Sequence, residues 1–315
     1  MDRAALALAV DIGGTKMAAS LVSADGTVLG ARSVPTLPGD AETVFAPLAG
    51  LIRETLAEAS GRPVVGIGIG TAGPLDLVEA TVSPVNILGW RGFPLAPRVA
   101  ELAPGIPVRM AGDGMCAAVG EHWRGAARSV DDVIVLVVST GVGGGLIQHG
   151  RLISGRTGNA GHIGHTVVDL DGDPCPCGGR GCVEGIASGP SMVAWARRQG
   201  WAGESAVDLA AAARDGDKVA TQAFERAGRA VAAGIVSAAA IADLSLAVVG
   251  GGVSRAADVL LPPLRQAIAD HAKLGFLRDL AVAPAELGNA AGLVGAAALA
   301  FEPERYPSTL RLSRS

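Results

Sequence analysis

The sequence predicts an α/β protein with a similar strand–turn–strand unit in each half. Apolar, β-branched runs typical of buried strands, such as 64–69 and 133–138, alternate with segments of helical apolar spacing, such as 41–59. Two further features support this class. Glycine- and threonine-rich turns at 11–16 and 139–145 each follow a strand run, and a strand resumes after each of them.

The composition excludes several classes of protein. Apolar residues make up 49% of the 315 residues and charged residues 18%, so the chain can bury a large core and is not disordered. The net charge of −4 and the lack of a basic run argue against nucleic-acid binding. No uncharged apolar run reaches 18 residues, so we expect no membrane span. With only four cysteines, three of them close together, we expect a reducing cytoplasm.

The first strand, 6–10, runs into a glycine corner. The corner contains Asp11, Gly13, Gly14, Thr15 and Lys16. Such a corner can present backbone N–H groups to phosphate oxygens, and its carboxylate can hold Mg²⁺ directly or through water. An ordinary hairpin, closed by the Asp25-Gly26 turn, is an equally good interpretation of this segment alone.

A carboxylate stands at the end of a later strand. The strand 108–111 leads into Gly112 and Asp113, and a helix is expected over 115–123. An Asp at this place can act in a cleft, facing the positive end of the helix. The segment by itself favours a simpler role for Asp113, as the N-cap of the helix.

The second turn and a third glycine cluster follow buried strands. The second turn contains Thr140, Gly141 and Gly143 after the strand 133–138, and Gly250, Gly251 and Gly252 follow a strand at 246–249. Neither Gly/Thr turn, at 11–16 or at 139–145, has the sequence of a P-loop or the setting of a dinucleotide fingerprint. Together with the first corner, the second turn and the glycine cluster predict two phosphate-contacting loops and a surface where a flat ligand lies on the backbone.

One segment concentrates metal-ligating side chains. Its candidates are His165, Cys175, Cys177 and Cys182. One imidazole and three thiolates complete a tetrahedral site, which favours structural Zn²⁺ because no position remains for a catalytic water. Three unrelated reduced cysteines are the alternative, and a disulfide is disfavoured because Cys175 and Cys177 are too close in sequence.

The domain boundary is expected near 112–120. We predict an N-terminal α/β domain over 1–115 and a C-terminal α/β domain over 116–290 that carries the zinc segment 164–184. The tail 304–315 is expected to be frayed.

From 10 to 299 the sequence resembles the ROK family of sugar kinases and repressors. The resemblance is carried by the glycine corner 11–16, the glycines of 66–68 with Gly73-Pro74, Asp113, the turn 140–145, the zinc segment ending at Glu184, the glycines 250–252 and the stretch 291–296. It implies a duplicated, ribonuclease H-like fold of the actin, Hsp70 and hexokinase group. In that fold, two domains flank an interdomain cleft, and the helix 291–303 returns to the N-terminal domain.

The resemblance also implies an ATP-dependent hexose 6-kinase, and a homodimer by family precedent. ATP with Mg²⁺ would lie on the two Gly/Thr loops, with the adenosine near Gly250–Gly252. Asp113 would be the general base for the sugar's 6-hydroxyl. The sugar-binding residues implied are Gly73, Gly112, Asp113, His162, His165 and Glu184, of which His165 would bridge the zinc and the sugar pocket.

Three positions depart from the family pattern. Gly112 and Met115 stand where most family kinases have Asn, and His162 stands where they have a sugar-binding Glu. Because sites that hydrogen-bond hydroxyls discriminate strongly, we expect a modified sugar, such as the amino-deoxy glucose kanosamine of antibiotic pathways. Ordinary glucokinase, an N-acylhexosamine kinase and a non-catalytic sugar-binding protein are the alternatives. A repressor is disfavoured because a helix-turn-helix would precede the first glycine corner.

Overall fold

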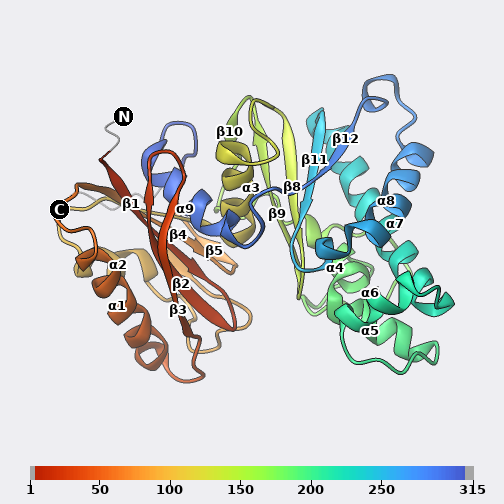
Figure 1. Cartoon of the computed structure of the whole chain (residues 1–315), viewed down its shortest axis with the longest axis horizontal. Helices are drawn as coiled ribbons and strands as arrows, with labels where there is room; N and C mark the ends of the chain where they lie inside the picture. The colour runs from red at the N-terminus through yellow and green to blue at the C-terminus, as the bar shows by residue number, and fades with distance from the viewer. Residues whose placement is uncertain (1–3, 309–315) are drawn as a thin grey trace. The chain divides into compact units, whose positions relative to one another are not determined.

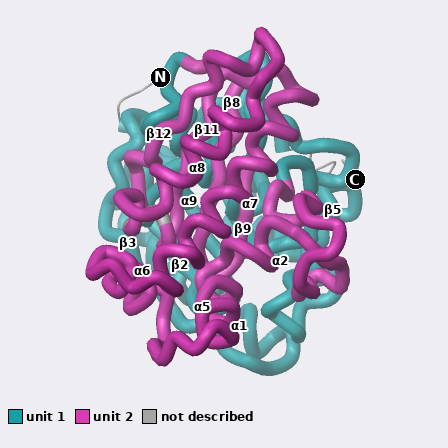
Figure 2. The backbone as a smooth tube through the Cα atoms, turned by 90° about the vertical axis from the view of Figure 1, so that its right-hand side faces the viewer, with its two compact units in different colours: residues 1–129, 145–161, 289–315 teal, residues 130–144, 162–288 magenta. Residues whose placement is uncertain are grey.

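A computed structural model of the chain describes residues 4–308. The chain divides into two compact units, which Figure 2 shows in different colours. Unit 1 comprises 1–129, 145–161 and 289–315, and unit 2 comprises 130–144 and 162–288. The break expected after residue 115 falls inside a helix that belongs to unit 1 as a whole, because that helix packs on the first sheet and on the C-terminal helix.

Unit 1 contains a five-stranded sheet of order β3-β2-β1-β4-β7 (Figure 1). Its strands are β1 Leu6–Ile12, β2 Lys16–Ser23, β3 Val28–Pro35, β4 Val64–Thr71 and β7 Val108–Gly112. β1 to β3 form an antiparallel meander, whereas β4 runs parallel to β1 and β7 runs parallel to β4. Parallel pairing brings the carboxyl ends of β1, β4 and β7 to one edge, where Ile12, Thr71 and Gly112 are in register. A small hairpin, β5 Leu75–Asp76 and β6 Thr81–Val82, follows β4.

Helices cover the sheet of unit 1. They are α1 Ala41–Ala57, α2 Leu95–Leu102, α3 Asp113–Arg124 and α9 Ala291–Phe301. α1 begins at its N-cap Asp40, whose carboxylate accepts a 2.8 Å hydrogen bond from Thr43 N. α9 packs against β4 and β1 and also against α3. This approach requires glycine, because a Cβ atom at Gly68 would clash with the carbonyl oxygen of Ala296.

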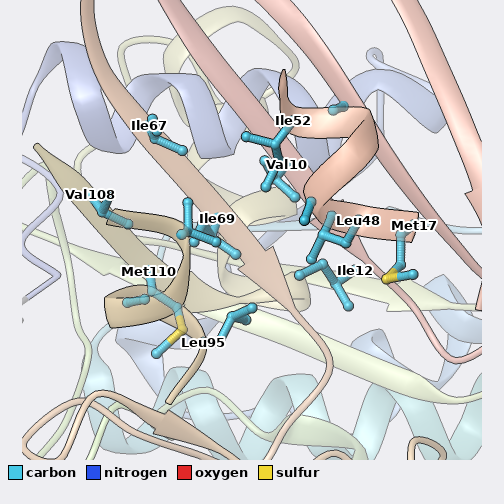
Figure 3. Close-up of a cluster of buried hydrophobic side chains, with 14 of the residues drawn as sticks. Val10, Ile12, Met17, Leu48, Ile52, Ile67, Ile69, Leu95, Val108 and Met110 are labelled. Carbon is cyan, nitrogen blue, oxygen red and sulfur yellow. The ribbon is translucent and has the colours of Figure 1, made fainter. Parts of the chain in front are cut away.

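The core of unit 1 lies between the sheet and α1 and α2. Figure 3 shows part of it, where strand residues such as Ile12 and Ile69 meet Leu48, Ile52 and Leu95 of the helices. All five side chains are fully buried, so this layer fixes which face of the sheet each helix covers.

The segment after α9 is not frayed where the structure describes it, contrary to expectation. Tyr306 is fully buried, and Leu152 N donates to Arg305 O at 3.1 Å. Ser154 Oγ donates to Pro307 O at 2.7 Å. The segment is held because an aromatic side chain and backbone hydrogen bonds dock it. The remainder of the expected tail, 309–315, lies outside the described residues.

The second sheet has the order β10-β9-β8-β11-β12. Its strands are β8 Val133–Val138, β9 Val142–Gln148, β10 Arg151–Leu152, β11 Leu246–Gly250 and β12 Ala281–Pro284. β11 is parallel to β8 and to β12, with Gly250 in register with Val137. The Gly/Thr turn and the Gly250–Gly252 cluster therefore follow the carboxyl ends of neighbouring strands.

The helices of unit 2 lie before and after β11 in the chain. They are α4 Val183–Ala187, α5 Gly189–Arg198, α6 Ala206–Arg214, α7 Lys218–Ala242 and α8 Ala257–His271, with 3₁₀ turns η1 Ile163–His165, η2 Val253–Ala256 and η3 Gly275–Leu277. α7 begins at Asp217, whose carboxylate accepts from Ala220 N at 2.8 Å. Within residues 4–308, no helix has the length and apolarity needed to cross a bilayer.

Candidate functional site

The glycine corner of unit 1 is a tight turn between β1 and β2. Gly13 N donates to Lys16 O at 3.0 Å, and Thr36 Oγ1 donates to Gly13 O at 2.8 Å. Gly14 packs against Asn86, whose Nδ2 would lie only 2.5 Å from a Cβ atom at position 14. A side chain at Gly14 would therefore push Asn86 away, which explains the glycine. The sequence does not predict this contact, because no motif around Asn86 indicates that it lies beside residue 14.

Asp11 is a buried carboxyl group near the end of β1. Burial, and to a smaller extent the nearby Asp113 carboxylate, raise its pKa to about 6, although Lys16 opposes both. A Cβ atom at Gly292 would lie 3.1 Å from Asp11 Oδ2, so the carboxyl group sits against the first turn of α9. The carboxylates of Asp11 and Asp113 repel each other electrostatically. A divalent cation bound near them would offset this repulsion.

Asp113 is the first residue of α3 and not its N-cap, which is Gly112. Its Oδ1 accepts a 2.7 Å hydrogen bond from Gly114 N. The N-cap interpretation of Asp113 is therefore wrong. The helix begins two residues earlier than expected, directly where β7 ends. Because the ends of β1, β4 and β7 are in register, Asp11, Asp113 and the loop that follows β4 with Gly73 share one edge of the sheet.

The Gly/Thr turn of unit 2 is held from several sides. Ser139 N donates to Gly141 O at 2.8 Å, and Gly189 N donates to Ser139 O at 2.8 Å. Glu184, on α4, accepts a 2.8 Å hydrogen bond from Val142 N through Oε2. The same oxygen would lie 2.7 Å from a Cβ atom at Gly141. Glu184 thus lies directly beside the turn that contains Thr140 and Gly143.

The Gly250–Gly252 cluster adjoins the same turn. Gly251 has φ +95°, and a Cβ atom there would clash with the backbone of Val138. A Cβ atom at Gly252 would lie 3.1 Å from Ser139 Oγ. Glycine is required at 251 for both conformation and space, so the backbone of the two turns comes close together.

The four predicted metal ligands converge. Their ligand atoms all lie within 4.8 Å of one another, with Cys175 Sγ 3.9 Å from His165 Nδ1 and Cys177 Sγ 3.9 Å from Cys182 Sγ. Zn–S bonds of about 2.3 Å in a tetrahedron would place two sulfurs about 3.8 Å apart. The donor set and its spacing therefore fit Zn²⁺ with four protein ligands.

The cysteines are held by a tight backbone loop. Cys175 N donates to Gly179 O at 2.8 Å, and Gly178 N donates to Cys175 O at 3.0 Å. Burial raises the pKa of Cys182 to about 12 and raises that of Cys175, whereas a hydrogen bond from the Gly179 backbone lowers the pKa of Cys177. A bound cation would supply the charge that stabilises all three thiolates.

Salt bridges anchor the loop that carries these cysteines. The Asp173 carboxylate accepts from Arg198 at 2.8 Å and from Arg226 at 3.2 Å. The two arginines come from α5 and α7, so the loop is tied to both helices. His162 precedes η1 and His165 is its last residue. Both side chains are exposed, and their ring centroids are 6.0 Å apart with planes that differ by 15°.

A sequence model of the ROK family matches residues 7–302 of the chain. This chain belongs to the ROK family. Its relatives include the glucokinase of Streptomyces coelicolor, which is 36% identical over 95% of this chain and 98% of the relative. The N-acetylmannosamine kinase of Escherichia fergusonii is 37% identical over 93% of this chain and 97% of the relative. The resemblance drawn from the sequence is thus confirmed.

The solved structures of ROK proteins agree with this assignment. A ROK glucokinase from Streptomyces griseus, in complex with glucose and AMPPNP, superposes with a TM-score of 0.80 and 37% identity over 94% of this chain and 99% of the other. The predicted two-sheet α/β fold of the actin and hexokinase group is therefore confirmed. The roles of individual residues, and the cleft between the domains, stay predictions.

Proposed function

We propose that this ROK protein transfers the γ-phosphoryl group of ATP to the 6-hydroxyl group of a glucose-like hexose. The observation that carries the proposal is the place of Asp113. It is the first residue of α3 at the carboxyl edge of the first sheet, in a chain 37% identical to a glucokinase that binds glucose and AMPPNP. Ligands of open α/β sheets bind at this edge.

Asp113 acts as the general base in the proposed reaction. Its carboxylate takes the proton from the 6-hydroxyl group, the freed oxygen attacks the γ-phosphorus, and the bond to the β-phosphate oxygen breaks to release ADP. The hydrogen bond from Gly114 N fixes one carboxylate oxygen and thereby orients the group. Because phosphoryl transfer depends chiefly on positioning and charge neutralisation, one oriented carboxylate suffices as the base.

The glycine turns bind the nucleotide in this proposal. Backbone N–H groups of the corner 11–16 and of the turn 139–145 contact phosphate oxygens, and the adenosine lies near Gly250–Gly252. Mg²⁺, when bound, neutralises charge on the transferred phosphoryl group. The residue that would hold Mg²⁺, directly or through water, is Asp11. Its buried carboxyl group interacts electrostatically with the carboxylate of Asp113.

The zinc cluster has a structural role. His165, Cys175, Cys177 and Cys182 would hold Zn²⁺ with four protein ligands, which would brace the segment that leads from His165 to Glu184. Glu184 and His165 are the proposed hydroxyl-binding groups of unit 2. The backbone N–H of Val142 already holds one oxygen of Glu184, which fixes the direction of its carboxylate.

Glucose and an amino-deoxy glucose are the two substrate candidates. The glucokinase relatives support glucose. A specific observation supports a modified sugar such as kanosamine: exposed His162 stands where family members have a carboxylate, beside the ring of His165. A neutral imidazole can donate a hydrogen bond, whereas a carboxylate only accepts. We therefore propose that the protein recognises a different substituent at C2 or C3 of the sugar.

A substrate panel tests the proposal. ADP release from ATP is measured with glucose, glucosamine, kanosamine, mannosamine, N-acetylmannosamine and fructose, and the position of the phosphate is determined on the product. Turnover of any hexose at its 6-hydroxyl group supports the kinase assignment. A much higher kcat/KM for glucose than for kanosamine would exclude only the amino-sugar candidate. No turnover of any sugar would exclude both this candidate and the kinase assignment.

A further inference from the structure

We propose that unit 2 carries a second ligand site, a pocket between α8, η3 and β12 that binds a small organic anion with an apolar body. The pocket has a volume of about 590 Å³. That size lies within the range of about 300–1,000 Å³ that is typical of small-molecule sites. The proposal is independent of the kinase reaction.

The lining of the pocket combines a positive charge with an apolar floor. The three charged residues among its nine lining residues, Arg265, Lys273 and Arg278, are all cations. The chain as a whole has 30 acidic and 26 basic residues, so a pocket lined by cations and no acid departs from its average. The floor is formed by Ile268 and Leu277, which are 6% and 3% exposed.

The cations are placed at the rim by the local fold. Lys273 Nζ donates to Ala269 O at 2.7 Å, which holds its ammonium group over the last turn of α8. Arg265 Nη2 donates to Val282 O at 3.2 Å, which links α8 to β12. Arg278 forms no side-chain hydrogen bond or ion pair with any residue that the structure describes. All three are exposed, so each keeps donors available for a ligand.

The pocket lies away from the proposed nucleotide loops. It is lined by the second half of α8 and by the start of β12, whereas the Gly250–Gly252 cluster precedes the first turn of α8. Along α8, the eight residue steps from Ala257 to Arg265, the first lining residue on that helix, span about 12 Å. A ligand in the pocket is therefore distinct from the nucleotide that the glycine turns are proposed to bind.

The chemistry of the lining selects the class of ligand. The buried floor favours an apolar body, because removal of apolar surface from water stabilises binding. The three cations favour a sulfonate, phosphate or carboxylate head. A neutral apolar compound would leave the cations unpaired, and a bare anion would leave the floor unused.

Fluorescence titration with a matched pair of probes tests the proposal. The anionic probe is 8-anilinonaphthalene-1-sulfonate, and the neutral probe is N-phenyl-1-naphthylamine, which has the same apolar body without the sulfonate. The purified full chain should bind one anionic probe per chain in the presence of excess ATP, and salt should weaken the binding. The neutral probe and inorganic phosphate alone should each bind at least tenfold more weakly.

Charge-neutralising variants complete the test. The double variant Arg265→Gln/Arg278→Gln should weaken binding of the anionic probe about tenfold, which corresponds to about 1.4 kcal/mol. The control Lys218→Gln removes an exposed cation of the same unit outside the pocket and should leave binding unchanged. Circular dichroism of each variant establishes that it is folded.

Four outcomes would overturn the proposal. They are unchanged binding to the double variant, equal binding of the neutral probe, loss of all anionic-probe binding on addition of ATP, and tighter binding of a ten-residue polyglutamate peptide. The last would assign the pocket to an acidic protein segment.

Discussion

The hydroxyl group of Tyr306 lies 2.9 Å from Nδ1 of His122, with both side chains buried. Arg305 donates to Nε2 of the same ring at 3.4 Å, so Nε2 is the acceptor and Nδ1 carries the proton of the neutral imidazole. Burial raises the pKa of Tyr306, which keeps its phenol neutral. The two residues join the chain's C-terminal segment to α3, the helix that begins at Asp113.

Tyr306→Phe should lower the free energy of unfolding by about 1–3 kcal/mol, because it removes the phenol oxygen that accepts from Nδ1 of the buried His122 imidazole. Urea unfolding monitored by circular dichroism measures the change. The control Ser23→Ala removes an exposed hydrogen bond to Asp25 and should change stability by less than about 0.5 kcal/mol. Equal effects of the two variants would contradict the assigned role of the His122–Tyr306 pair.

Asp113→Asn should lower kcat by about 10²–10⁴-fold and leave KM for ATP nearly unchanged, because it removes the proposed base but keeps a similar side-chain shape. Steady-state kinetics with the best sugar of the panel measure both constants. Glu54→Gln, which neutralises a largely exposed carboxylate on α1, serves as the control and should be as active as the unaltered chain. An Asp113→Asn variant that retains full activity would exclude Asp113 as the base.

Asp11 should make stability depend on pH in a defined direction. Its folded pKa, about 6, lies above the ordinary value of 3.8, so the protonated form is favoured in the folded state. The stabilisation that Asp11 gives the folded state is fully present below about pH 4. It is lost as the pH rises through about 6, and the free energy of unfolding then falls by about 3 kcal/mol. Urea unfolding in magnesium-free buffer across this range should therefore show the free energy of unfolding falling relative to Asp11→Asn. A difference that does not vary with pH would contradict the raised pKa.

Removal of the predicted metal ligand Cys177 should greatly weaken zinc binding. We expect one Zn²⁺ per chain by elemental analysis, and a large loss of zinc together with a lower Tm in Cys177→Ser. The matched control is Cys116→Ala, which changes the chain's other cysteine, a buried residue on α3. Cys116→Ala should retain its zinc even if it is less stable. Full zinc content in Cys177→Ser would show that Cys177 is not a ligand.

Gly68→Ala should destabilise the protein by about 1–3 kcal/mol, because the added methyl group forces α9 away from β4. Gly50→Ala is the matched control. Gly50 lies inside α1, and beyond the adjacent residues and the helix backbone no atom lies within 4 Å of its Cβ position, so alanine should stabilise the helix by up to about 1 kcal/mol. Thermal or urea unfolding of both variants measures whether their stability changes in opposite directions. Unchanged stability of Gly68→Ala would contradict the close packing of α9 on β4.

Much of the fold could be read from local patterns. The runs 64–69 and 133–138 predict buried strands because continuous β-branched stretches suit strands covered on both faces, and both form strands. The sequence predicts a start of α3 at 115, two residues too late, because Gly112 and Gly114 beside Asp113 resemble a loop. The structure shows that Asp113 and Gly114 are helical, in a helix that packs against α9. The sequence also does not predict that the segment after α9 is ordered, because its partner, the buried His122, lies far away along the chain.

The sequence by itself determined the ROK family and the α/β class, and it predicted the four candidate metal ligands that the structure brings together. These follow from the order of short segments and from donor atoms concentrated within about twenty residues. Only the tertiary structure decided that the carboxyls of Asp11 and Asp113, 102 residues apart, raise each other's energy, and that Glu184 holds the turn at Val142. The physical reason is that burial and electrostatic interaction act between neighbours in space, and parallel strands make neighbours of residues that lie far apart along the chain.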